Sequence, residues 1–222
     1  MHYDTRANDH GLSHDPFKAL VSPRPIGWIS TISEQGIRNL APYSFFNAVS
    51  DRPPMVMFSS AGRKDSLKNI EATGEFVCSF VSNALCEAMN MSSAPVQPGV
   101  DEFQLAGLTP AASVHVKPPR VAESPAALEC RLWKIDPLPT PPGKSGPAYW
   151  LVFGEVIGVY IDDRYLTDGR FDVAAAEPLA RLGYMDYAVV NRQSLFSLNR
   201  PRVSEKGDTA TLVPGPWDGV YR

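Results

Sequence analysis

The chain has 222 residues, of which 44% are hydrophobic and 20% charged, so it can form one domain with a filled core. A net charge of −3 gives no general attraction to nucleic acid or to an anionic membrane. No apolar run approaches the roughly 20 residues that a membrane span needs, and the N-terminus lacks the apolar core of a secretory signal. Three cysteines without C-x-x-C spacing predict reduced thiols in a cytoplasmic protein.

The order of apolar and turn-forming segments predicts a single domain, with a polar arm over residues 1–15, a core over about 16–200 and an irregular tail over 201–222. Apolar or alternating runs predict strands over residues 26–32, 37–46, 55–58, 75–81, 127–135 and 149–161, with a short edge strand at 113–116. Short helices are expected over residues 66–72, 84–91 and 179–182.

Turn signals connect these elements. Residues 33–36 fit a hairpin loop, Gly74 closes the first helix, and the proline-rich segment 137–147 fits a hairpin excursion because strand patterns flank it. Gly154 and Gly158 indicate bends or close backbone approaches in the longest strand. Six or more strands without crossover helices exclude a doubly wound α/β fold. The sequence therefore predicts a mainly β fold, an antiparallel barrel that is closed or nearly closed.

Residues 59–69 read S-S-A-G-R-K-D-S-L-K-N, a strand end that leads into a helix. A helix N-terminus offers free N–H groups and the positive end of a dipole. Two cations and three hydroxyl donors lie at this junction: Arg63, Lys64, Ser59, Ser60 and Ser66. The segment is thus a candidate phosphate site, and an ordinary capped helix with solvated basic residues is the alternative.

Residues 39–46 read N-L-A-P-Y-S-F-F. An isoalloxazine ring needs a flat apolar surface and hydrogen-bond donors along its pyrimidine edge. Tyr43, Phe45 and Phe46 could supply the surface, and backbone N–H groups of this proline-broken stretch the donors; a core strand of aromatics is the alternative. Arg24 could pair with a phosphate or with a surface carboxylate.

Several familiar chemistries are excluded by the motifs. There is no G-x-G-x-x-G, complete phosphate-binding loop, G-x-S-x-G elbow, H-E-x-x-H or cysteine cluster. His10 and His14 stand four apart with no third ligand nearby, so we expect no metal site. The spacing does not decide whether Asn39 caps a turn or contacts a ligand.

Several motifs occur in register along the chain. They are R-P-I-G-W-I-S-T at 24–31, N-L-A-P-Y-S-F-F at 39–46, R-K-D-S at 63–66, G-E-F-V at 74–77 and G-V-D-E-F at 99–103. Together they resemble the flavin-reductase-like family of FMN-binding split barrels, related to flavoredoxin and to the reductase components of two-component monooxygenases. The resemblance covers roughly residues 16–200. It implies a six-stranded Greek-key split barrel, usually a homodimer with FMN near the subunit interface.

Carried over motif by motif, the resemblance implies a set of cofactor-binding residues and no catalytic side chain. The set is Arg24, Ser30, Thr31, Ala41, Pro42, Tyr43, Ser44, Phe45, Ser59, Ser60, Arg63, Lys64, Asp65 and Ser66. Position 66 is often Thr in the family, and Ser keeps the hydroxyl. The stretch 181–187 would lie near the open face of the flavin, from the partner chain in one arrangement, which makes Arg181 and Tyr187 substrate-binding candidates.

The resemblance implies an NAD(P)H-dependent flavin reductase, in which NADH or NADPH is a transient hydride donor to FMN, with FAD as the alternative flavin. The protein would contribute orientation and electrostatics. Reduced flavin could then supply an oxygenase partner. A flavoredoxin-like FMN electron carrier without nicotinamide turnover remains open, as does a split barrel that binds another phosphate cofactor or haem.

Overall fold

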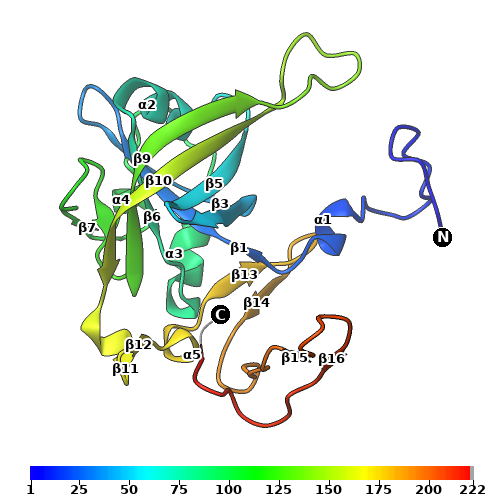
Figure 1. The fold of residues 1–222 in the computed structure, drawn as a ribbon. Helices are drawn as coiled ribbons and strands as arrows, with labels where there is room; N and C mark the ends of the chain where they lie inside the picture. Colours follow the sequence, from blue (N-terminus) through cyan, green and yellow to red (C-terminus); the bar gives the residue numbers. More distant parts are fainter. Residues whose placement is uncertain (221–222) are drawn as a thin grey trace.

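The structure is a computed structural model that describes residues 1–220; positions 221 and 222 of the predicted tail lie outside the described residues. The fold is mainly β and is built around one seven-stranded sheet in the order β3-β2-β6-β9-β10-β5-β4, in which every neighbouring pair is antiparallel (Figure 1). The strands are β2 (Gly27–Ile32), β3 (Arg38–Tyr43), β4 (Phe46–Asp51), β5 (Pro54–Ala61), β6 (Glu75–Ser79), β9 (Ala126–Pro137) and β10 (Tyr149–Ile161).

The two edge strands of this sheet, β3 and β4, are consecutive in the chain and separated only by residues 44–45. The Phe45 carbonyl accepts a hydrogen bond from the Ser59 N–H at 2.8 Å, which ties the bend to β5. The sheet therefore curls until its edges meet at one bend, but no ladder joins β3 to β4. The prediction was a barrel that is closed or nearly closed; the sheet is not closed, and the count of six strands implied by the resemblance was wrong, because the main sheet has seven. The extra strand is β4, because residues after the bend pair with β5.

Smaller elements surround the main sheet. The helices are α1 (Phe17–Leu20), α2 (Asp65–Thr73), η1 (Asn83–Leu85), α3 (Cys86–Met91), α4 (Glu102–Leu105), η2 (Asp163–Tyr165) and α5 (Val173–Ala176). One small sheet has the order β1-β13-β14, and the others are the pairs β7–β8, β11–β12 and β15–β16. Their strands are β1 (Arg24–Pro25), β7 (Pro110–Ala111), β8 (Arg120–Val121), β11 (Leu166–Thr167), β12 (Arg170–Phe171), β13 (Leu179–Arg181), β14 (Tyr187–Val189), β15 (Arg202–Val203) and β16 (Ala210–Thr211).

Two predicted elements were wrong for reasons that lie outside their own residues. The segment expected to be helical at 179–182 is strand β13, which pairs with β1 on one side and with β14 on the other. The edge strand expected at 113–116 is absent; there the N–H groups of Val114 and His115 donate to the buried carboxylate of Glu129. Distant partners, not local pattern, decide both segments.

The longest strand and the helix after β5 were confirmed. Strand β10 has the predicted bounds, and the proline-rich segment is the tip of the β9–β10 hairpin, which projects from the body (Figure 1). Gly154 and Gly158 lie at the two register shifts of this hairpin. A Cβ on Gly154 would lie 2.3 Å from Cζ of Phe76, so glycine is needed for this close approach. Helix α2 ends at Gly74, as expected.

The core has two principal parts on opposite faces of β2. Ile29 faces a cluster with Phe58, Leu67 and Phe76, which fixes α2 against the sheet. Trp28 faces a second cluster on the other side, and its Nε1 donates to Ser92 Oγ at 2.8 Å. Because both faces of β2 are buried, a slip by one residue would exchange Trp28 and Ile29 between two clusters that are packed for different side chains.

Among residues 1–220, no helix is long and apolar enough to cross a membrane. Cys78, Cys86 and Cys130 carry free thiols. No group of three or more His, Cys, Asp or Glu in the described part of the chain could hold a metal ion.

Replacing Gly154 with alanine should destabilise the protein, because the new methyl group would overlap Phe76, which is fully buried and cannot move aside. We expect a loss of about 1–3 kcal/mol in the free energy of unfolding, measured by urea denaturation. Gly146→Ala is the matched control, since nothing lies within 4 Å of its added Cβ. Equal stability of the two variants would contradict the close approach.

Candidate functional site

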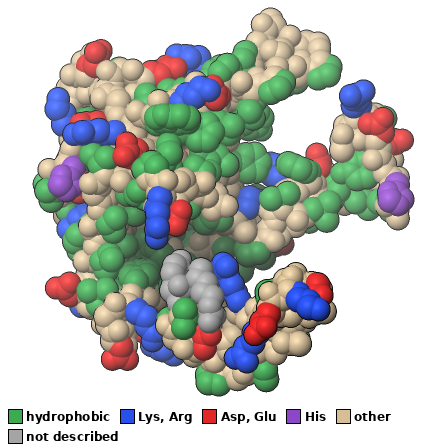
Figure 2. Space-filling view, viewed as in Figure 1, with side chains coloured by type: hydrophobic (Ala, Val, Ile, Leu, Met, Phe, Trp, Pro, Cys, Tyr) green, Lys and Arg blue, Asp and Glu red, His purple; other side chains and the backbone are tan. Residues whose placement is uncertain are grey.

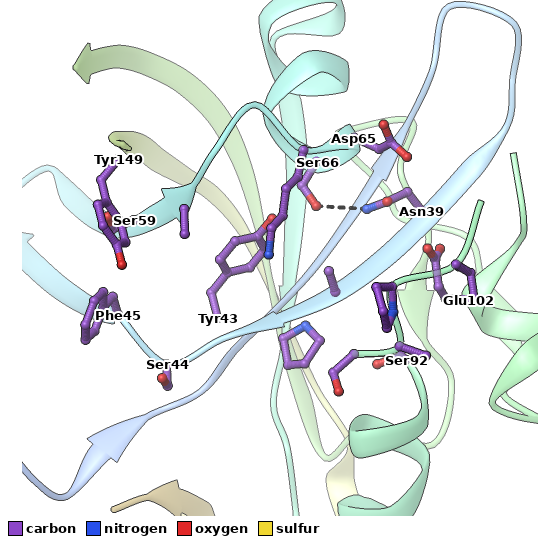
Figure 3. A pocket seen from close by; sticks show the side chains of 18 of the residues that line it. Asn39, Tyr43, Ser44, Phe45, Ser59, Asp65, Ser66, Ser92, Glu102 and Tyr149 are labelled. Carbon is purple, nitrogen blue, oxygen red and sulfur yellow. Dashed lines mark hydrogen bonds between the residues drawn. The ribbon is translucent and has the colours of Figure 1, made fainter. Parts of the chain in front are cut away.

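A cavity of about 540 Å³ lies where β3 ends, beside β5 and the start of α2 (Figure 3). This volume is in the range of small-molecule sites in proteins. It brings together nine of the predicted cofactor-binding residues: Ala41, Pro42, Tyr43, Ser44, Phe45, Ser59, Lys64, Asp65 and Ser66. Residues that lie far apart in the sequence complete the wall. We call this space the candidate flavin cavity.

One end of the cavity is aromatic. Figure 3 shows Phe45 and Tyr149 side by side at this end, and their ring centroids lie 6.3 Å apart. Tyr43 lies further in and packs against the buried ring of Phe58, with centroids 4.6 Å apart. These side chains give a planar ligand an apolar surface of fixed orientation.

The other main feature is the N-terminus of α2. Lys64 is the N-cap residue, and its side chain, which has no acceptor atom, makes no capping hydrogen bond. The first N–H groups of a helix have no intrahelical acceptor, so those of α2 are available to a ligand. Lys64, Asp65 and Ser66 line the cavity at this point. The helix dipole and the Lys64 ammonium therefore favour an anion here.

Two buried hydroxyl groups in the cavity wall have no hydrogen-bond partner among residues 1–220, Tyr43 Oη and Ser59 Oγ. Ser66 Oγ accepts from Asn39 Nδ2 at 2.9 Å, the dashed line in Figure 3, which leaves the serine proton free to be donated. A buried polar group without a partner costs about 1–3 kcal/mol. A ligand with several acceptor oxygens would remove this cost, so the wall fits a phosphate-bearing cofactor.

Burial raises the pKa of Tyr43 above the ordinary tyrosine value, although the nearby hydroxyls of Ser66 and Ser60 partly offset the effect. The phenol is therefore protonated at neutral pH and acts as a donor. Burial also raises the pKa of Glu102, whose carboxylate accepts the Leu40 N–H at 3.0 Å. The cavity wall thus holds a phenol donor at Tyr43 and a hydrogen-bonded carboxyl group at Glu102.

The charge balance of the cavity depends on Asp65. Its carboxylate is paired with Lys68 at 3.2 Å on the exposed side of α2. Lys64, one residue earlier, makes no ion pair with any carboxylate of the described chain. The positive charge of Lys64 is consequently available to a ligand.

The structure does not bring Ser30 and Thr31 to the cavity surface. Both are fully buried in β2. Ser30 Oγ donates to the Pro119 carbonyl, and Thr31 Oγ1 accepts from Asn69 Nδ2 at 3.0 Å. They connect β2 to neighbouring segments, and their direct contact with a cofactor stays a prediction.

The side chains of Ser60 and Arg63 are also paired with other groups of this chain. Ser60 Oγ donates to the Gly62 carbonyl at 2.9 Å, which shapes the turn before α2. Arg63 forms an ion pair with Glu71 across the outer side of α2, and its guanidinium lies 5.9 Å from the Trp150 ring centroid. A phosphate contact from Arg63 remains a prediction that requires it to leave Glu71.

The remaining predicted residues, Arg24, Arg181 and Tyr187, line a second cavity of about 320 Å³. The two cavities share wall residues, including Pro42 and Ser44. The guanidinium of Arg24 donates to three backbone carbonyls, that of Leu182 at 2.7 Å. In this structure the partners of Arg24 are backbone carbonyls, and its contact with a phosphate stays a prediction.

Sequence reasoning missed wall residues that come from distant segments. These are Lys18, the 92–96 segment, Glu102 and Tyr149, and it left Asn39 undecided. The 92–96 segment is held in place by the hydrogen bond from Trp28 to Ser92. No local pattern gives this information, because a loop after a helix has the same composition whether or not it faces a cavity.

Residues 20–180 match the family described as flavin reductase like domain. The match covers most of the chain, and the chain therefore belongs to this flavin-binding family. An uncharacterized protein of Aquifex aeolicus is 38% identical over 189 residues, which are 82% of this chain and 92% of that protein.

Two solved structures support the same family assignment. Nitrilotriacetate monooxygenase component B from Bacillus cereus is 31% identical with a TM-score of 0.77, over 86% of this chain and 96% of that chain. The 2-nitrobenzoate 2-nitroreductase of Pseudomonas fluorescens is 25% identical with a TM-score of 0.75, over 97% of this chain and 99% of that chain. The split-barrel resemblance noted in the sequence is thereby confirmed.

Proposed function

We propose that this chain is an FMN-binding oxidoreductase that reduces flavin with NADH or NADPH. The observation that carries the proposal is the uncapped N-terminus of α2 beside Lys64, which faces a cavity of suitable size. When bound, FMN supplies a ring that accepts hydride from a reduced nicotinamide. The residues of this chain would bind, orient and desolvate the reactants, without a catalytic acid or base.

The phosphate of FMN would lie at the start of α2. Donors would be the free N–H groups of the first turn, the Lys64 ammonium and the hydroxyls of Ser59 and Ser66. Membership of a flavin-binding family and the two unpartnered hydroxyls in the wall support this assignment. The ring would lie against the aromatic end, where Phe45 and Tyr149 limit the access of water.

A monooxygenase component among the solved structures supports an oxygenase as the acceptor of reduced flavin. This partner class is part of the proposal, as is a cytoplasmic location inferred from the cysteines. An electron carrier that holds FMN and has no nicotinamide turnover is the main rival.

Lys64→Gln should raise the Kd for FMN about tenfold or more, since a hydrogen bond to a charged group contributes about 1.5–3 kcal/mol. Quenching of flavin fluorescence in a titration measures the Kd. Lys117→Gln removes the same charge at an exposed position outside the cavity and should leave the Kd within about threefold. The phosphate assignment is wrong if both variants bind FMN like the parent protein.

Under anaerobic conditions, NADH and then NADPH are added to the FMN-loaded protein. We expect the flavin absorbance band to bleach within minutes. FMN with either donor, but no protein, is the control and should react far more slowly, because the protein supplies the orientation. Persistent yellow colour with both donors would contradict the reductase and favour the carrier.

We also propose that two copies of the chain associate. The terminal segments project from the body in Figure 1 and carry exposed apolar side chains, with Leu20 75%, Phe196 78% and Leu198 81% exposed. Figure 2 shows further hydrophobic side chains gathered over the body beside these segments. Association of two copies would remove these apolar side chains from water.

Sedimentation equilibrium should report about twice the chain mass of 24.3 kDa. Phe196→Ser with Leu198→Ser should shift the protein towards the monomer, whereas Val114→Ser, at an equally exposed site on the body, should not. A parent protein that sediments as a monomer refutes the association.

A further inference from the structure

The second cavity, which we call the basic cavity, has an unusual charge composition. Three cations line it, Lys18, Arg24 and Arg181, and no Asp or Glu is among its described lining residues. Tyr184 and Tyr187 add aromatic surface. None of the three cations forms an ion pair with a carboxylate in the part of the chain that the structure describes.

The backbone forces these cations together. Arg24 and Arg181 are directly opposite one another in the β1–β13 pair, a position where like charges destabilise an antiparallel sheet. Lys18 is brought close because α1 lies against the turn after β13; a Cβ on Gly183 would lie 2.3 Å from the Ala19 Cβ. Three chain segments thus place three like charges around one space.

Arg24 shows the cost of burying a charge close to a like charge. This side chain is only 6% exposed, and its buried Nε has no hydrogen-bond partner. Burial and the charge of Arg181 lower the pKa of Arg24. Like charges held together in a partly buried space attract an anion, which would offset both desolvation and mutual repulsion.

Arg181 is pre-oriented for such an anion. Its guanidinium stacks on the Tyr187 ring, 4.5 Å from the centroid, and one nitrogen donates to the Tyr184 carbonyl. The guanidinium has five N–H donors, so others remain for a bidentate contact with an oxyanion. Lys18 is exposed at the rim and can move to the same anion.

We propose that the basic cavity is a subsite for the oxyanion, phosphate or carboxylate, of the compound that exchanges hydride with the bound flavin. Lys18 and Arg181 would contact the anion, and Arg24 would position the surrounding backbone through its three carbonyl contacts. The two cavities share the wall of Pro42 and Ser44, so a compound anchored in one can extend into the other. The inference rests on the proposed function, because that compound meets the flavin there.

The test is isothermal titration of the FMN-saturated protein with two probes, inorganic pyrophosphate and benzoate. Lys18 lines both cavities, so FMN is kept saturating for every variant; with the α2 end occupied, the titration reports the remaining anion site. We expect at least one probe to bind, and Lys18→Gln with Arg181→Gln to raise its Kd about tenfold or more. Lys18→Arg with Arg181→Lys should keep the Kd within about threefold. Arg202→Gln, at an exposed position outside both cavities, is the neutral control.

The same titration is repeated with the flavin-free Lys64→Gln protein. We expect its α2 end to bind phosphate weakly, so that binding of a probe reports the basic cavity. Binding of pyrophosphate would identify the anion as the phosphates of the hydride donor, and binding of benzoate would identify a carboxylate acceptor. The subsite is overturned if neither probe binds, or if the Lys18 and Arg181 variant binds as well as the parent. A protein that binds the probes but not FMN would instead overturn the proposed function.

Discussion

The orientation of α2 is the constraint on which the site depends. Leu67 and Ile70 are fully buried against the sheet, so the helix cannot turn its N-terminus towards solvent. Its N-cap residue is a lysine, which offers a charge in place of a capping oxygen. The first turn therefore presents unpaired N–H groups and a cation to a cavity. Ser, Thr, Asp and Asn are the preferred residues at this position, where the side-chain oxygen accepts from one of these N–H groups.

The bend at residues 44–45 supplies the opposite wall. Because β3 and β4 are the two edges of one curled sheet, the chain between them is held without a complete ladder. The stretch is fixed instead by the hydrogen bond from Ser59 to Phe45. The candidate flavin cavity lies beside this split, with Pro42, Ser44 and Phe45 in its wall. The same split leaves Pro42 and Ser44 in the walls of both cavities.

Local pattern was sufficient for the elements whose stability is local. The strand over 149–161 and the helix closed by Gly74 follow from spacing and turn chemistry. The phosphate site at the junction before that helix stays a prediction. Pattern failed at 179–181, where β1 and β14 decide the conformation. It also failed for Lys18 and Tyr149, which reach the cavity only through the tertiary fold. The motifs in register, and not composition, identified the family.

The most direct test of the central claim compares FMN with riboflavin, which differ by the phosphate alone. If the start of α2 holds that phosphate, FMN should bind about a hundredfold more tightly than riboflavin, or about 2.7 kcal/mol, in parallel fluorescence titrations at low salt. Equal affinities for the two flavins would show that the phosphate is not held, and would contradict the account.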